Sequence, residues 1–163
     1  EYGEVPGIEL VQLDVTRQED VDAVAARAHE LADGPVDVLV NNAGHAMMAP
    51  QESGDLDAAR AMFETNLWGA AAMVQAVVPA MRQAGRGTVV TVSSIGARLS
   101  NPLVGFYHGS KYALAAFSEA LANEVGHFGV RVVMIEPGMI DTDFPQATVV
   151  SGGVTDQIGR AHV

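Results

Sequence analysis

The 163-residue sequence contains no cysteine, which excludes a disulfide framework, a thiolate nucleophile and a zinc–thiolate site. Basic residues are also scarce: 9 Lys and Arg stand against 20 Asp and Glu, and the formal charge of -11 disfavours nucleic acid and anionic lipid as partners. Apolar runs end well short of the ~18 residues of a membrane span, and the opening EYGEVPG lacks signal-peptide character. We therefore expect a cytoplasmic protein with no membrane or nucleic-acid partner.

Apolar residues are plentiful instead: they make up 48% of the sequence, enough to build the core of one domain. Short runs rich in β-branched residues alternate with longer stretches of helical periodicity. We predict strands at residues 11–15, 36–40, 88–92 and 130–135, and helices at 20–31, 57–81 and 107–125. This alternation predicts an α/β domain within residues 1–157, built on a doubly wound parallel sheet that helices cover on both faces.

Small or polar residues follow each predicted strand. Asp14 ends the first, NNAG (41–44) follows the second, SS (93–94) the third and PG (137–138) the fourth. Such residues are also ordinary turn formers, so any one of these loops is better explained as a turn. Because parallel strands place their carboxyl ends at one edge of the sheet, the four loops together favour a shared ligand site at that edge.

A tyrosine and a lysine lie one helical turn apart in the stretch FYHGSKYAL (106–114). Such pairs also occur by chance on helix surfaces. A fixed positive charge beside a phenol nevertheless favours the phenolate, which would make Tyr107 a usable proton donor and acceptor with Lys111 as its neighbour. The histidines at positions 29, 45, 108 and 127 have no partner at metal-ligand spacing, so we expect no metal site.

In their order and spacing, NNAG, SS, YHGSK and EPGMIDT (136–142) resemble the short-chain dehydrogenase/reductase family, from about residue 14 to residue 144. The resemblance implies a Rossmann-like fold. It also implies an NAD(P)-dependent oxidoreductase that moves hydride between a nicotinamide cofactor and a carbonyl or secondary alcohol. In this family the tyrosine of the motif is the general acid/base, which assigns that role to Tyr107. The chemistry agrees, because a nearby phenol can supply the proton that a developing alkoxide takes up.

Three further catalytic residues follow from the resemblance. Lys111 is expected to assist Tyr107 and to hydrogen-bond the nicotinamide ribose. Ser94, thirteen residues before Tyr107, is expected to hold the substrate oxygen, whereas we interpret Ser93 as a strand-end residue. Asn66 in ETNLWG matches the asparagine that holds a water of the proton relay, although a polar residue in a helix groove would look the same.

The resemblance also assigns a cofactor side, with NAD or NADP as the cofactor. It implies contacts to the adenine and adenosine from Asp14, Asn41, Ala43 and Gly44, and contacts to the nicotinamide from Pro137, Gly138, Ile140 and Thr142. The family's first strand, its T-G-x-x-x-G-x-G phosphate turn and the strand that selects NAD or NADP have no counterpart here. The chain therefore resembles an internal fragment, and we expect it to lack turnover on its own.

Two predictions concern partners. The loops around the expected site carry Met47, Met48, Leu99, Leu103 and Phe106, which suit a hydrophobic carbonyl or alcohol substrate but are equally expected in a core. The helix at 57–81 is apolar around more than the ~100° stripe of a single sheet contact. Because the family dimerises through this helix and the next, we predict a homodimer or homotetramer through residues 61–78 and 113–121.

Two other readings remain open. One is a catalytically silent nucleotide-sensing or scaffold protein with the same sheet, and the other is a nucleotide-sugar epimerase, which can share the Tyr and Lys. Separately, we interpret the last six residues, IGRAHV (158–163), as the in-frame translation of a sequencing adapter, with an ordinary polar tail as the alternative. We expect them to be an artefact and not part of the protein.

Overall fold

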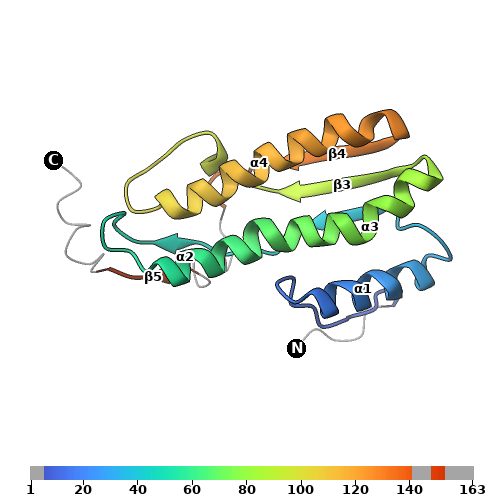
Figure 1. The fold of residues 1–163 in the computed structure, drawn as a ribbon, viewed down its shortest axis with the longest axis horizontal. Coiled ribbons are helices and arrows are strands. Elements are labelled where there is room, and N and C mark those ends of the chain that lie inside the picture. The colour runs from blue at the N-terminus through green and yellow to red at the C-terminus, as the bar shows by residue number, and fades with distance from the viewer. Residues whose placement is uncertain (1–5, 141–147, 153–163) are drawn as a thin grey trace.

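A computed structural model of the chain describes residues 6–140 and 148–152. Its main sheet contains β1 (Val38–Asn41), β3 (Gly87–Val92) and β4 (Val130–Ile135), all parallel and in the order β1-β3-β4 (Figure 1). The register pairs Val38 with Thr88 and Gly87 with Val130. Three of the four predicted strands are therefore confirmed, each within two residues of its expected start.

The strand predicted at residues 11–15 is wrong. Residues 8–14 belong to no strand, and in the described ranges no other strand lies beside them. A β-strand needs a hydrogen-bonding neighbour, and apolar character alone does not supply one. Leu13 and Val15 still pack against the core, and Val15 lies so close to Gly69 that a Cβ there would be 2.5 Å from its Cγ2.

The helices form where they were predicted, with a difference in the second. The helical elements are α1 (Gln18–Leu31), α2 (Leu56–Phe63), η1 (Glu64–Gly69), α3 (Ala70–Ala84) and α4 (Gly105–Val125). Asp55 starts α2 by accepting a hydrogen bond from the Asp57 amide at 2.8 Å. The helix expected at 57–81 is continuous from α2 to α3, but η1 is a π-helical turn in its middle.

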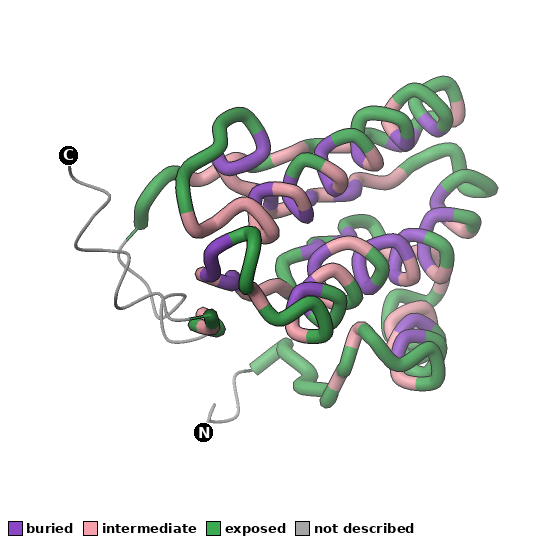
Figure 2. Tube along the Cα trace, turned by 60° about the vertical axis from the view of Figure 1, so that its left-hand side comes forward, coloured by how far each residue is buried: buried purple, intermediate pink, exposed green. Residues whose placement is uncertain are grey.

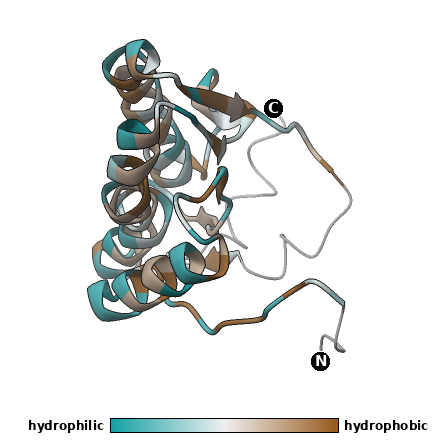
Figure 3. Cartoon of the chain, turned by 90° about the vertical axis from the view of Figure 1, so that its right-hand side faces the viewer, coloured by the Kyte–Doolittle hydropathy of each residue, from teal (hydrophilic) through white to brown (hydrophobic). Residues whose placement is uncertain are grey.

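The predicted α/β fold on a parallel sheet is confirmed, but among the described residues all of these helices lie on one face of that sheet (Figure 3). The physical reason is the strand order. Because β1, β3 and β4 follow one another in a single direction, right-handed crossovers place every connecting helix on the same side. Side chains on the other face remain exposed, among them Val40 at 56% and Ile135 at 47%.

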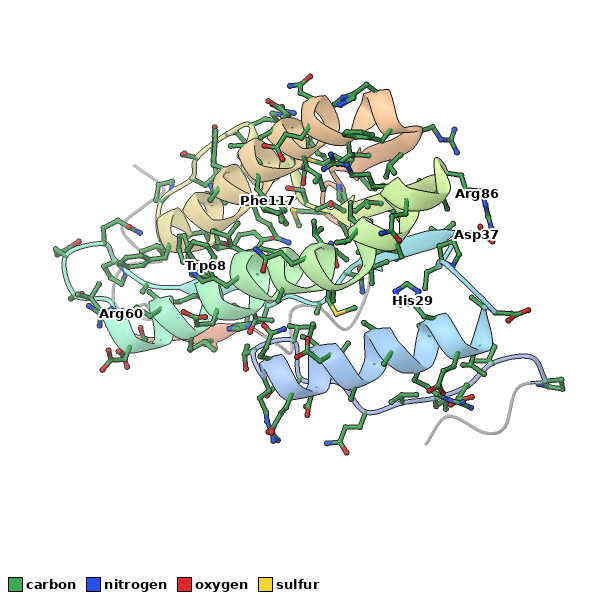
Figure 4. All side chains as sticks on the ribbon, turned by 45° about the vertical axis from the view of Figure 1, so that its right-hand side comes forward. His29, Asp37, Arg60, Trp68, Arg86 and Phe117 are labelled. Atoms are coloured by element: carbon green, nitrogen blue, oxygen red, sulfur yellow. The ribbon has the colours of Figure 1, made fainter. Side chains whose placement is uncertain are left out.

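The core lies between the sheet and this helical layer, where the buried residues gather (Figure 2). Val77, Met81 and Val89 are at most 2% exposed within it. At the end of the sheet where β1 and β3 begin, Arg86 forms an ion pair with Asp37, and the two side chains lie together in Figure 4. The pair therefore ties the amino ends of the two strands together, away from the edge where a site is expected.

A second, smaller sheet lies beyond the carboxyl end of β1. There β2 (Met47–Met48) pairs in parallel with β5 (Val149–Val150). A small core of Met47, Ala49, Ala59 and Met62 lies near it, with Phe106 and Tyr107 packed against that core. Within the described ranges, no helix is long and apolar enough to cross a lipid bilayer. Thr142 and residues 158–163 lie outside the described residues.

Candidate active site

A cavity of about 740 Å³ lies at the carboxyl edge of the sheet, where the sequence predicted a shared site. Four segments line it: the loop after β1, the end of β3 with the short 3₁₀ helix η2 (Ile95–Ala97), the first turns of α4, and residues 137–140 after β4. Backbone hydrogen bonds hold two of these walls together, because the Ser93 amide donates to Ile135 and the Ile95 amide to Pro137. The cavity therefore depends on loops that the parallel strands bring to one edge.

Tyr107 and Lys111 line this cavity from successive turns of α4. Lys111 is only 4% exposed, and its Nζ donates to the Val92 carbonyl at 3.1 Å and lies 5.9 Å from the centroid of the Tyr107 ring. Burial lowers the pKa of Lys111 to about 8, because a low-dielectric surrounding disfavours the ammonium. Of the pair that the sequence singled out, Lys111 is therefore buried, and Tyr107 is partly buried at the wall of the cavity.

Ser94 lines the same cavity as the N-cap of η2. Its Oγ accepts a hydrogen bond from the Gly96 amide at 3.0 Å. A serine hydroxyl that accepts one bond still has a proton to donate, so Ser94 can bind an oxygen placed in the cavity. Ser93 is also at the cavity and is 5% exposed.

Asn66 lies behind the cavity, in the π-helical turn η1, and is 1% exposed. Its Oδ1 accepts from the His45 amide at 3.0 Å, and its Nδ2 donates to the His45 carbonyl at 2.9 Å and to Ser110 Oγ at 3.0 Å. Ser110 Oγ in turn donates to the Tyr107 carbonyl at 2.7 Å. Asn66 therefore links the loop after β1 to the turn of α4 that carries Tyr107. Single π-helical turns of this kind occur often at functional sites.

The residues predicted for the cofactor side divide into two groups. Gly44, Pro137, Gly138 and Ile140 line the cavity. Asn41, Ala43 and Asp14 do not: Asn41 is buried and donates weakly to the Ala70 carbonyl at 3.4 Å, and Ala43 is exposed.

Asp14 is exposed at the end of residues 8–14, which belong to no strand. Hydrogen bonds from Thr16 lower the pKa of the Asp14 carboxyl. The Asp14 side chain closes a local turn, since its Oδ1 accepts from the Thr16 hydroxyl at 2.7 Å and the Thr16 amide at 2.9 Å. Its predicted contact with an adenine stays a prediction.

The cavity also contains residues to which the sequence assigned no role, chiefly Asn42 and His108. His108 is 6% exposed, and its Nδ1 accepts from the Asn101 amide at 3.3 Å. Burial lowers the pKa of His108, which favours the neutral imidazole. The sequence signal that could have identified His108 is its spacing from Lys111. His108 is three residues before Lys111, and residues three apart on a helix share a face. Within residues 6–140 and 148–152, no three His, Asp or Glu side chains gather into a possible metal site.

This arrangement suits proton transfer to or from an oxygen held in the cavity. Ser94 offers a hydrogen-bond donor, Tyr107 a phenol, and Lys111 a buried amine whose charge is easily lost. Gly44 is close behind them, since a Cβ there would lie 3.0 Å from Asn66 Oδ1 and 3.6 Å from Lys111 Nζ. A Cβ at position 44 would therefore crowd Asn66 Oδ1 and be in ordinary contact with Lys111 Nζ.

Comparison with known proteins places these features in a family. The family model described as short chain dehydrogenase matches residues 3–150. Among curated relatives, the oxidoreductase BOA17 of Botryotinia fuckeliana is 40% identical over 134 residues, which is 82% of this chain and 48% of that protein. Estradiol 17-beta-dehydrogenase 1 of Rattus norvegicus is 36% identical over 157 residues, 96% of this chain and 44% of that protein.

Solved structures give the same result. A short-chain dehydrogenase from Streptomyces avermitilis superposes with a TM-score of 0.82 at 37% identity, covering 92% of this chain and 60% of that one. A gluconate 5-dehydrogenase from Burkholderia cenocepacia, in complex with NADP and tartrate, superposes with a TM-score of 0.77 at 27% identity. The superposition covers 83% of this chain and 52% of that one. The chain spans about half the length of the curated relatives it matches. It belongs to the short-chain dehydrogenase family, with a Rossmann-like α/β fold.

Proposed function

We propose that the protein is an NAD(P)-dependent oxidoreductase that interconverts a carbonyl compound and a secondary alcohol, with Tyr107 as general acid/base. The observation that carries the proposal is the convergence of Ser94, Tyr107 and Lys111 on one cavity at the carboxyl edge of the sheet. They come from two different elements, the loop after β3 and the first turns of α4, so chance neighbourhood in the sequence does not explain their meeting.

The cavity fits a nicotinamide cofactor, which would supply or accept hydride at the substrate carbon. Lys111 Nζ has donors left after its bond to the Val92 carbonyl, and ribose hydroxyls are suitable acceptors. Residues 137–140 and Gly44 form the neighbouring wall, and a Cβ at Gly44 would be only 3.0 Å from Asn66 Oδ1. A similar solved structure contains NADP, which supports a nicotinamide cofactor in general, and NAD and NADP both remain in the proposal.

During reduction, the carbonyl oxygen gains negative charge as hydride reaches the carbon. Ser94 donates a hydrogen bond to this oxygen, and Tyr107 transfers its phenolic proton to it, which leaves the alcohol product and a phenolate. The ammonium of Lys111 stabilises that phenolate, and the relay through Asn66 that the family resemblance implies would return the proton. Oxidation of an alcohol runs through the same proton transfers in reverse.

The proposed substrate has a bulky apolar body. Ile95, Leu99, Met139 and Ile140 line the cavity with exposed apolar surface. Two relatives carry names that refer to such alcohols, retinol dehydrogenase 8 of Homo sapiens at 37% identity and estradiol 17-beta-dehydrogenase 1. We propose this class of substrate without choosing a member. The cytoplasmic location expected from the sequence stays a prediction.

The test is Tyr107→Phe in the full-length protein, assayed with NADH or NADPH and a panel of apolar ketones. Loss of the proton donor should lower kcat ~10²-fold or more while cofactor affinity, measured by nicotinamide fluorescence, stays nearly constant. Tyr112→Phe is the matched control, because Tyr112 is on the same helix but is 44% exposed and does not line the cavity. Unaltered turnover in Tyr107→Phe would sink the assignment. Cofactor binding without turnover in the unmodified protein would favour a nucleotide-sensing role.

A further inference from the structure

The segment between η2 and α4, residues 98–104, forms one wall of the cavity through Leu99 and Asn101. Its backbone is anchored at two points. The Asn101 amide donates to His108 Nδ1 at 3.3 Å, and the Leu103 carbonyl accepts from the Ala49 amide at 2.7 Å. Between them Leu103 has φ 69, a left-handed conformation that is unfavourable for a residue with a side chain. Such a conformation persists only where surrounding contacts hold it.

His108 is the side chain at the first of these anchors, and it is buried behind the wall. A Cβ at Gly96 would lie 2.7 Å from its Cδ2, 3.1 Å from its Nε2 and 3.3 Å from Ser94 Oγ. The imidazole therefore fills the space in front of Gly96, beside the hydroxyl that is expected to hold the substrate oxygen. Because Nδ1 accepts a hydrogen bond, the neutral ring carries its proton on Nε2.

We propose that His108 is a positioning residue that anchors residues 98–104 against α4 and so determines how bulky a substrate fits beside Tyr107. The anchoring rests on contacts of the chain itself, whereas its effect on substrate choice rests on the proposed function. With the anchor in place, Leu99 and Asn101 are held at a fixed distance from the first turns of α4. Without it, the hydrogen bond from the Ala49 amide is the remaining anchor that holds Leu103, and we expect the wall to loosen beside Ser94.

Apolar neighbours around the ring support a structural role for a neutral imidazole. Gly96 and Ala97 of η2, which packs against α4, are buried, and Tyr107 lies next to the ring at 5.8 Å between centroids. An aliphatic side chain would satisfy these apolar contacts equally well. What it would not supply is the acceptor for the Asn101 amide, so the hydrogen bond is the part of His108 to test.

Two substitutions of similar size separate the hydrogen bond from packing. His108→Asn keeps an acceptor near the place of Nδ1, whereas His108→Leu fills the site without one. In His108→Leu, hydrogen exchange at the Asn101 amide should become about 3- to 10-fold faster, and KM for a bulky apolar ketone should rise by a similar factor with kcat less affected. His108→Asn should restore most of both values. His127→Leu is the control, because His127 is exposed and does not line the cavity.

Gly96→Ala provides an independent arm, and it keeps the test decisive if His108→Leu does not fold. The added methyl group displaces the imidazole, so hydrogen exchange at the Asn101 amide should again be faster. In the double variant with His108→Asn, this increase in exchange rate should be smaller. Equal exchange at Asn101 in the unmodified protein, His108→Leu and Gly96→Ala would overturn the anchoring. If the unmodified protein lacks turnover, the proposed function fails, while the exchange measurement still decides the role of His108.

Discussion

Lys111 shows how much one side chain depends on its surroundings. In the sequence it is one of only 9 basic residues in a strongly acidic chain. In the folded protein only 4% of its surface is exposed to solvent. Its Nζ donates to the Val92 carbonyl, and burial brings its pKa from 10.5 to about 8. The fold therefore bears an energetic cost at neutral pH for keeping this group charged.

That cost predicts an unusual dependence of stability on pH. Below pH 8 the lysine is charged in both the folded and the unfolded protein. Between pH 8 and 10.5 the unfolded chain binds more protons than the folded one, so the free energy of unfolding should rise with pH. The gain attributable to Lys111 should approach about 3 kcal/mol at the upper end of this window.

Urea unfolding of the unmodified protein and of Lys111→Met, at about pH 7 and about pH 10, measures this contribution. Titrating groups far from Lys111 affect both proteins alike, so the difference between them reports Lys111 together with its neighbour Tyr107. An identical pH dependence in the two proteins would contradict the buried, charged lysine.

At the scale of elements, two helices end at glycines that contact each other. The end of α3 passes into Gly85 with φ 67, and α4 passes through the 3₁₀ turn η3 (Gly126–Phe128) into Gly129 with φ 80. The two ends touch, because a Cβ at Gly129 would lie 2.1 Å from the Gly85 carbonyl oxygen. Both the backbone conformation and the contact therefore require glycine at position 129.

Gly129→Ala should consequently lower the free energy of unfolding by more than about 2 kcal/mol, since alanine is unfavourable at positive φ and would also clash with a backbone oxygen. Gly126→Ala is the matched control: its φ is -57, and apart from its chain neighbours and its own helix backbone no atom lies within 4 Å of a Cβ built there. We expect that substitution to be neutral or slightly stabilising. Thermal unfolding of both variants measures the two changes in stability. An equal loss of stability in both would show that the two helix ends do not meet in this way.

At the scale of the whole molecule, the described chain exposes apolar surface on two sides. One is the uncovered face of the sheet, with Val38 and Val40 more than half exposed. The other is the outer side of the helical layer, where Trp68 is 57% exposed (Figure 4). On the neighbouring helix α4, Tyr112 is 44% exposed. Exposed apolar surface of this extent marks interaction surfaces.

For the helical side we propose the homo-oligomer expected from the sequence, formed through residues 61–78 and 113–121. The full-length protein should give the mass of a dimer or tetramer in light scattering, and Trp68→Lys should shift it toward the monomer because a charge would be buried in the contact. Leu31→Lys is the control, at an equally exposed apolar position outside the two proposed segments. A monomer at micromolar concentration would refute the proposal.

Much of this protein could be predicted from its sequence because the relevant signals are local. Runs of β-branched residues give β1, β3 and β4, and helical periodicity gives α1 and α4, since each pattern reflects the repeat of a single element. The spacing of Ser94, Tyr107 and Lys111 is local too, because a loop of limited length joins η2 to the first turn of α4. These features pointed to the cavity and to the family before any contact was known.

Other features depend on which segments meet, and local patterns do not carry that information. Residues 11–15 have strand composition but no strand beside them in the described ranges, and one-directional strand order leaves a sheet face uncovered. The inward position of Asn66 depends on a π-helical turn held by His45 and Ser110. The role of His108 depends on Gly96 and Asn101 lying against its ring. In each case a long-range contact, and not the residue's own preference, determines the outcome.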